Sequence, residues 1–352
     1  MGISVIIPAY NAGRFIEEAI KSVLLQDRPA DEIIVVNDGS TDRDYTELES
    51  LGTQIRVIQQ SNRGVSAARN LGFALARQEY VAILDADDYW ILGKLRAQMT
   101  HLTQHPDCDA VFCLGLNWVS DGDGTTWTHP GVPPVGAQHE PEAVRLHYRD
   151  FLCGIPVATS TMVVKKAVWQ ALGGFDETMR YGEDQEFNLR LSREYRVDVL
   201  DEIGMLYRQH PSSATARIQD RNHWAELIEG AVSRWGLIDR WGIGVDHAKI
   251  ARHLAQLHFL HGYEHFWRGS IAIARREFSR ALVRRPFAPK CLSYILASSI
   301  PGLAIALRSR LRPRPKHARS DVADNWLLHP DRCENAGSES HRAKKRPNRE
   351  RP

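Results

Sequence analysis

The first hundred residues alternate between short apolar runs and longer segments that carry an apolar stripe of helical period. The apolar runs predict strands at residues 3–7, 32–36, 55–58 and 80–84, and the striped segments predict helices at residues 12–26 and 65–76. Strands and helices that alternate in this way are typical of right-handed βαβ units on a parallel sheet. We therefore predict an α/β fold with a Rossmann-like, mainly parallel sheet flanked by helices.

The pattern is less regular farther along the chain. A long strand and a Gly/Pro-rich loop are expected over residues 109–136, another strand over residues 157–164, and helices over residues 166–172 and from Glu183 onward. Beyond residue 211 the chain has long helical patterns. Within them, residues 257–263 and 274–286 resemble one helical hairpin of the tetratricopeptide type. One such unit cannot bury its own face, so we expect a C-terminal helical appendage.

Charge is distributed unevenly along the chain. The net charge is +2, but residues 308–352 carry 13 Lys or Arg against 6 Asp or Glu, a net +7 that leaves −5 for the residues before them. A negative body is not expected to bind nucleic acid. The basic tail over residues 311–352 has the composition of a disordered segment, although it could also meet anionic lipid.

A run of 17 residues without charge, residues 291–307, precedes Arg308, Arg310 and further basic residues. Its length is at the lower limit for a membrane-spanning helix. A buried core helix and an interfacial anchor are equally open, and a full span is least expected. The basic residues favour peripheral contact with an anionic leaflet through residues 291–316.

The five cysteines form no CxxC pair, which is typical of reduced thiols in a cytosolic protein. No basic-then-apolar leader precedes the first expected strand. We therefore expect a cytoplasmic location, with association at the inner face of the plasma membrane as an open question.

Two carboxylate segments follow predicted strands. Residues 84–88 (LDADD) place three carboxylates directly after an apolar run, and Asp38 follows the strand at residues 32–36. A Mg²⁺ or Mn²⁺ ion prefers one or two carboxylates together with substrate phosphate oxygens. A carboxylate such as Asp38 can also accept the imide N–H of uracil or thymine. The alternatives are a solvated Asp-rich turn for residues 84–88 and an Asx-turn or helix cap for Asp38.

Glu183 and Asp184 begin a predicted helix. The positive end of the helix dipole keeps a carboxylate ionised, as a general base must be. The alternative is a pair of helix-capping carboxylates that the same dipole stabilises.

Five segments together resemble the family 2 inverting glycosyltransferases with the GT-A fold, over about residues 3–210. They are residues 4–11 (SVIIPAYN), 37–42 (NDGSTD), 62–70 (NRGVSAARN), 84–88 (LDADD) and 182–184 (GED). The resemblance implies a GT-A domain over residues 1–215, followed by the helical region over residues 216–310. It also implies metal-dependent transfer of a sugar, with inversion, from a nucleoside-diphosphate sugar to a hydroxyl of a glycan or lipid-linked saccharide. The donor would be a UDP or dTDP sugar, the cofactor Mn²⁺ or Mg²⁺, and the setting surface polysaccharide biosynthesis.

The resemblance also assigns roles to individual residues. Asp184 would be the general base, with Glu183 able to exchange roles with it. Asp87 would be the first metal ligand, with Asp85 and His210 beside it, Asp88 in support and Arg208 paired with phosphate charge. The nucleotide would be bound by Pro8, Ala9, Tyr10, Asn11, Asp38, Arg69, Asp85 and Ala86, with Arg69 near the diphosphate. For Tyr10 a packing role is an equal alternative, and for residues 207–213 an exposed loop is an equal alternative.

Other protein classes fit the motifs less well. No GxGxxG follows the first strand and no GxxxxGK[ST] occurs, which counts against dinucleotide-binding and P-loop proteins. A sugar nucleotidyltransferase would want a Gly-rich, basic loop where this chain has residues 8–13. A non-catalytic glycan-binding or scaffold protein on a GT-A frame is the second hypothesis, although intact Asp38, Asp87 and Asp184 argue against a degenerate site.

Overall fold

The computed structural model describes residues 1–310 except residues 122–125, 138, 156, 212, 214–217, 286–288 and 301. Residues 1–314 belong to one compact unit. The expected basic tail, residues 311–352, lies outside the described residues, and the boundary expected near residue 215 stays a prediction.

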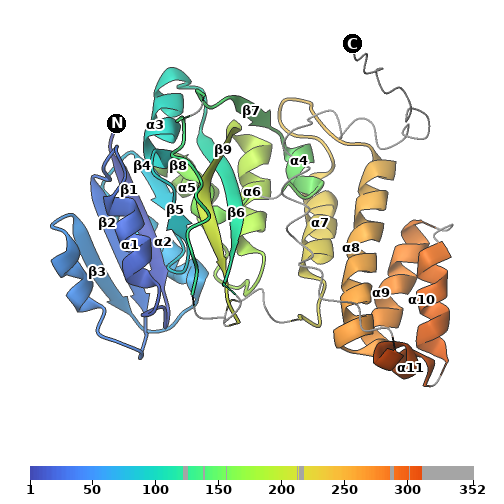
Figure 1. Ribbon diagram of the computed structural model, residues 1–352. Helices are drawn as coiled ribbons and strands as arrows, with labels where there is room; N and C mark the ends of the chain where they lie inside the picture. The colour runs from blue at the N-terminus through green and yellow to red at the C-terminus, as the bar shows by residue number, and fades with distance from the viewer. Residues whose placement is uncertain are drawn as a thin grey trace, which may run out of the picture. The chain divides into compact units, whose positions relative to one another are not determined.

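A single mixed sheet forms the centre of the N-terminal part (Figure 1). Over the described residues it has nine strands in the order β3-β2-β1-β4-β8-β6-β9-β5, with β7 paired to β9. The strands are β1 (Ile3–Ala9), β2 (Glu32–Asp38), β3 (Ile55–Gln60), β4 (Tyr80–Ile83), β5 (Tyr89–Trp90), β6 (Ala110–Val119), β7 (Ala143–Leu146), β8 (Val163–Lys165) and β9 (Val197–Gln209). β1, β2, β3 and β4 are parallel, as predicted. β8 runs antiparallel to β4 and β6, so the sheet as a whole is mixed.

Helices cover both faces of the parallel strands, and this explains why β1 and β2 are apolar along nearly their whole length and buried throughout. The helices and 3₁₀ turns of this part are α1 (Ile16–Leu24), η1 (Thr46–Leu51), α2 (Val65–Leu75), α3 (Lys94–Gln104), α4 (Tyr148–Leu152), η2 (Thr159–Thr161), α5 (Lys166–Leu172) and α6 (Glu183–Glu194). α2 packs very closely on β1, because a Cβ on Gly72 would lie 2.4 Å from Cγ2 of Ile6. A Gly72→Ala change would therefore push α2 off the sheet.

Three sequence expectations need correction. The helix expected over residues 12–26 begins only at Ile16, because the amide of Ala12 donates to the Tyr45 hydroxyl (2.7 Å) and residues 12–15 form a turn. The strand expected over residues 157–164 is instead η2 followed by the short β8, since the Thr161 hydroxyl bonds back to the carbonyl of Ala158 (2.7 Å). The long strand β9 was not predicted.

The C-terminal helices pack on one another. They are α7 (His223–Trp235), α8 (His247–Arg268), α9 (Ile271–Arg284), α10 (Pro289–Ser299) and α11 (Leu303–Arg310). α8 and α9 form the expected helical hairpin, with Gly262 close to the ring of Phe278. Their shared core consists of Phe266, Ala274, Phe278, Ala297 and Ala304. The hairpin face that one unit would leave open is thus covered by α10 and α11.

No individual helix among the described residues is long and apolar enough to cross a bilayer. α10 and α11 would suffice together by length and composition, but they are bent by 106° at the break between them.

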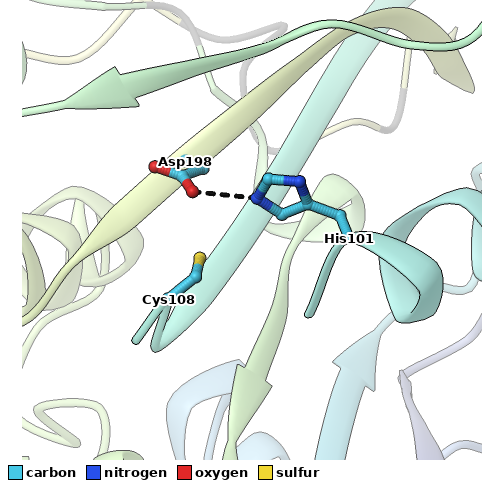
Figure 2. Close-up of side chains that lie close together, drawn as sticks. All are labelled: His101, Cys108 and Asp198. Atoms are coloured by element: carbon cyan, nitrogen blue, oxygen red, sulfur yellow. Dashed lines mark hydrogen bonds and ion pairs between the residues drawn. The ribbon is translucent and has the colours of Figure 1, made fainter. Parts of the chain in front are cut away.

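A buried polar cluster joins α3, the start of β6 and the start of β9 (Figure 2). His101, Cys108 and Asp198 place possible metal-ligand atoms within 4.8 Å of one another. Nε2 of His101 lies 2.8 Å from Oδ2 of Asp198, and Arg145 on β7 donates to the same carboxylate. The Cys108 thiol donates to the carbonyl of Ala110 (3.1 Å). Because Arg145 already balances the charge of Asp198, we interpret the cluster as an ion-pair network that fastens α3 and β7 to β9.

Candidate active site

The carboxyl ends of β1 and β2 form one wall of the candidate site. The Asn11 amide donates to the Ser40 hydroxyl and the Thr41 amide donates to Oδ1 of Asn11, both at 2.9 Å, so the loops after the two strands are tied together. Asn11 has φ +48°, a left-handed conformation that Asn tolerates. Pro8 and Ala9 are buried in β1, whereas Tyr10 is 55% exposed. Tyr10 is therefore not a core residue, and its ring is accessible to a ligand.

Asp38 is buried at the end of β2 and holds the loop that leads into α2. Its Oδ1 accepts hydrogen bonds from Nε2 of Gln60 (2.6 Å) and the amide of Arg63 (2.8 Å), and its Oδ2 accepts one from the amide of Gly64 (2.8 Å). Gly64 has φ +92°, a conformation that favours glycine. Asp38 thus holds the loop that leads into α2 without capping that helix, and a carboxylate has lone pairs beyond these three bonds.

The acidic segment after β4 turns back on itself, with the amide of Asp88 donating to the carbonyl of Asp85 (3.0 Å). Asp88 is buried and accepts hydrogen bonds from the Ser160 hydroxyl (2.8 Å) and the amide of Arg208 (3.2 Å). Burial and the neighbouring carboxylates of Asp87 and Asp85 raise the pKa of Asp88 well above its usual range. These hydrogen bonds to the buried Asp88 carboxyl group hold the turn in place. Ala86 is buried in the same turn.

Asp87 faces the end of β9. Its side chain is 32% exposed, and its Oδ2 lies 2.9 Å from Nε2 of His210. Arg208 is buried, pairs with Glu18 and donates to the carbonyl of Asp87 (2.9 Å). Three aromatic rings surround the Arg208 guanidinium at centroid distances of 4.9, 4.1 and 5.1 Å, namely those of Phe15, Trp118 and Trp127. The exposed-loop alternative is thus wrong for Arg208, and its cation positions Asp87.

The start of α6 brings Glu183 and Asp184 to the same site. Arg69 on α2 is buried and donates to Oε1 of Glu183 (2.7 Å) and to Oδ1 of Asp85 (2.8 Å). The bond to Glu183 joins residues 114 positions apart in the sequence, and the bond to Asp85 joins residues 16 positions apart. Arg69 therefore links the acidic segment directly to the first turn of α6, and two carboxylates already balance its charge.

The turn η2 forms a second link between the same two segments. The Ser160 hydroxyl accepts a hydrogen bond from the amide of Asp85 (3.0 Å) and donates to Asp88, while the Thr159 hydroxyl donates to Oδ2 of Asp184 (3.4 Å). Sequence analysis missed both hydroxyls because it placed them in a strand. The run of three hydroxyl residues at 159–161, flanked by apolar residues, was the available signal.

Negative charge exceeds positive charge in this cluster. Five carboxyl groups share it with the cations of Arg69 and Arg208 and the imidazole of His210; the carboxyl groups are those of Asp85, Asp87, Asp88, Glu183 and Asp184. Burial raises the pKa of Asp184, although Arg69 and the amide of Gln185 oppose the rise, and burial likewise raises the pKa of Glu183. A divalent cation would relieve this excess. Asp87 and His210 fit it, since carboxylate oxygen and imidazole nitrogen both bind Mn²⁺.

Comparisons with known proteins agree with this geometry. Residues 4–172 match the family model of glycosyl transferase family 2. The uncharacterized glycosyltransferase EpsJ of Bacillus subtilis strain 168 is 35% identical over 221 residues, 60% of this chain and 62% of EpsJ. The uncharacterized glycosyltransferase YibD of Escherichia coli K12 is 37% identical over 128 residues, 36% of this chain and 37% of YibD. The chain thus spans less than two thirds of the length of these curated relatives.

A solved structure has the same fold. S. aureus TarS, residues 1–349, in complex with UDP-GlcNAc superposes with a TM-score of 0.58 at 21% identity, over 88% of each chain. The same part of TarS in complex with UDP gives a TM-score of 0.56. The GT-A prediction of the fold is therefore confirmed.

Proposed function

Because residues 4–172 match the family model of glycosyl transferase family 2, we propose that the protein transfers a sugar, with inversion, from a nucleoside-diphosphate sugar to an acceptor hydroxyl in a metal-dependent reaction. One observation carries the proposal. Arg69 and η2 hold the acidic segment and the start of α6 in one site, so the expected metal ligand and the expected base serve the same substrate.

Asp87 and His210 would hold the Mn²⁺ or Mg²⁺ ion, with Asp85 beside them. The bound ion would supply charge compensation for the departing nucleoside diphosphate. The imidazole of His210 favours Mn²⁺ over Mg²⁺, which prefers oxygen ligands. Arg208 keeps Asp87 in place through the backbone carbonyl of that residue.

Asp184 acts as the general base. Its carboxylate accepts the proton of the acceptor hydroxyl while that oxygen forms a bond to the anomeric carbon. The bond from the anomeric carbon to the diphosphate oxygen breaks at the same time, and the diphosphate leaves with the electron pair. One displacement inverts the anomeric centre. Thr159 orients the base, and Glu183, bound by Arg69, fixes the first turn of α6.

A UDP or dTDP sugar is the proposed donor. Tyr10 is exposed directly after β1 and Asp38 ends the neighbouring parallel strand β2, so an aromatic side chain and a carboxylate lie at the carboxyl ends of these two strands. A uracil or thymine ring offers an imide N–H that a carboxylate accepts. The complexes of TarS with UDP and UDP-GlcNAc, in a protein of the same fold, support this choice.

The proposed acceptor is a hydroxyl of a glycan or lipid-linked saccharide, in surface polysaccharide biosynthesis at the cytoplasmic face of the membrane. Support comes from the apolar, basic helical surface of the same chain, which is described in the next section. A non-catalytic glycan-binding protein on the same frame is the competing function. The raised pKa of a half-buried Asp184 favours the enzyme, because a binding protein has no need of a poised base.

Donor turnover separates the two functions. The full chain is incubated with UDP, dTDP and GDP sugars, with Mn²⁺ and with a chelator, and release of the nucleoside diphosphate is measured. We expect release from a UDP or dTDP sugar only with Mn²⁺, and loss of release in Asp184→Asn with donor binding retained. Donor binding without release in the wild type would support the binding protein. Preference for a GDP sugar would overturn the base assignment.

A further inference from the structure

The outer face of α10 and α11 is apolar and exposed. Leu292 and Leu296 on α10 and Ile300, the residue directly after this helix, follow one another at intervals of four residues and are 51%, 62% and 44% exposed, and Ile305 on α11 is 69% exposed. Side chains at this spacing share one side of a helix. Scattered exposed leucines are ordinary, but a row of large apolar side chains marks an interaction surface. We call these four residues the apolar row.

The opposite side of α10 is already used for packing. Cys291 and Ala297 are buried, and Ala297 belongs to the core that α8, α9 and α11 share. The exposed side of α10 thus carries Leu292 and Leu296 beside Ser293 and Ser299, whereas a surface helix of a globular protein normally turns mainly polar residues outward. The apolar row is therefore not part of the core of the described residues.

Charge around the apolar row has one sign. The sequence from Phe278 to Ser320 contains no Asp or Glu but ten Lys or Arg. Arg285 and Lys290 are exposed and flank α10. Arg308 serves a different purpose, because its guanidinium donates to the carbonyls of Phe266, His265 and Gly269 and so holds α11 against the end of α8.

We propose that the apolar row docks on an anionic lipid bilayer, with α10 lying in the plane of the interface. Apolar side chains would enter the boundary between headgroups and acyl chains, and the surrounding cations would meet the negative surface potential. The bend of 106° between α10 and α11 suits a segment that lies on the membrane. A second copy of the chain that docked through the same face is a poorer occupant, because it would place the exposed Arg285 and Lys290 of both copies at one interface. The C-terminal tail has the same drawback, since residues 308–352 carry a net +7.

Vesicle binding of the full chain tests the proposal. Sedimentation with phosphatidylcholine vesicles that contain phosphatidylglycerol is compared with sedimentation with phosphatidylcholine vesicles alone. We expect binding to the anionic vesicles, little binding to the neutral ones, and a decline with salt. Leu292→Glu with Leu296→Glu should weaken binding at least about tenfold. Arg285→Gln should weaken it about fivefold, since one basic residue near the surface contributes about 1 kcal/mol.

A matched control shows whether the added negative charge alone weakens vesicle binding. Leu25 is 66% exposed in the sheet domain, so Leu25→Glu makes the same chemical change away from α10 and should leave vesicle binding unchanged. Donor turnover and thermal unfolding of each variant confirm that it is folded.

Three results would overturn the proposal. They are absence of binding to anionic vesicles, equal loss of binding in Leu25→Glu, and a Leu292→Glu/Leu296→Glu variant that changes from dimer to monomer in sedimentation while its vesicle binding is unchanged. The last would assign the apolar row to a second copy. None of these results concerns sugar transfer from the donor, so that part of the proposed function stands or falls separately, whereas the proposed membrane setting of the acceptor depends on them.

Discussion

The protein contains two buried clusters of charge that are built in opposite ways. In the candidate active site, five carboxyl groups share two arginines and a histidine, and burial raises the pKa of Asp88, Glu183 and Asp184. Between the C-terminal helices, the buried carboxylate of Glu277 is surrounded by partners. It lies 2.8 Å from Nδ1 of His258, accepts from Asn222 (3.2 Å), and pairs with Arg276 and Arg280.

The pKa shifts of the buried carboxyl groups reflect this difference between the two clusters. Bonds from His258 and Asn222 outweigh the burial of Glu277 and lower its pKa to about 2. The helical cluster is complete without a ligand, and its ionised carboxylate favours the folded state. In the candidate active site, by contrast, burial raises the pKa of Asp88, Glu183 and Asp184, so ionisation of these three groups opposes folding. Substitutions in the two clusters should therefore have opposite effects on activity and on stability.

The largest expected effect is that of Asp184→Asn on turnover. Asparagine keeps the shape but cannot accept the acceptor proton, so kcat should fall by about 10³-fold or more. Since burial raises the pKa of Asp184, its ionised form opposes folding, and the neutral variant should be at least as stable as the wild type. The rate of diphosphate release gives kcat, and thermal unfolding gives the stability. A strong loss of stability with little loss of kcat would make Asp184 a structural residue like Glu277.

The next effect concerns the proposed metal ligands. Asp87→Ala and His210→Ala should each weaken Mn²⁺ binding by about 10- to 100-fold, as measured by the Mn²⁺ concentration for half-maximal turnover. Excess Mn²⁺ should restore part of the activity of His210→Ala, since Asp87 remains. His101→Ala, at the ion-pair cluster of Figure 2, is the matched control and should leave the Mn²⁺ requirement unchanged. If wild type and Asp87→Ala needed the same Mn²⁺ concentration for half-maximal turnover, the metal would not be bound at this site.

The pH dependence of turnover should show the raised pKa directly. A general base works only when it is deprotonated, so kcat should rise as the pH rises through the pKa of Asp184, above the ordinary Asp range near 3.8. The acidic limb of the profile is the measurement. An acidic limb below that ordinary value would contradict the effect of burial.

The first half of the fold, and the acidic segments in it, could be predicted because the signals are local. Each apolar run from β1 to β4 is followed at once by its polar residues, and parallel strands bring those residues to one edge. Asp184 was found in the same way, at the start of a helix.

The links within the site could not be predicted, because they join distant parts of the chain. Arg69 was expected near the diphosphate, yet its partner Glu183 lies 114 residues away and no local pattern reveals that bond. β9 was missed because Asp198, Asp201 and Glu202 interrupt its apolar pattern, and only its pairing with β6 makes it a strand. Thr159 and Ser160 were missed because the apolar residues around them predicted a strand at the place of η2.

Glu277→Gln should lower stability while leaving kcat of the folded protein unchanged. The charge that His258, Arg276 and Arg280 surround is lost, and the free energy of unfolding at neutral pH should fall by about 1 to 3 kcal/mol. The direction of the pH dependence follows from the lowered pKa of Glu277. The stabilisation of the wild type is present above the ordinary pKa of 4.5 and is lost as the pH falls towards about 2, so wild type and variant should converge in that window. Urea unfolding across this range is the measurement, and a constant difference between the two proteins would contradict the ionic account.

The smallest effect should come from an exposed ion pair, which shows how much of the contrast depends on burial. Nζ of Lys21 lies 3.4 Å from Oε2 of Glu17 one helical turn away, with the two side chains 57% and 43% exposed. Water screens such a pair, so Lys21→Ala should change the free energy of unfolding by no more than about 0.5 kcal/mol and should not change kcat. Urea unfolding at low and high salt gives the comparison. If Lys21→Ala lowered the free energy of unfolding as much as Glu277→Gln, charge compensation alone would account for stability. The burial of Glu277 and Asp184 would then make no difference to it.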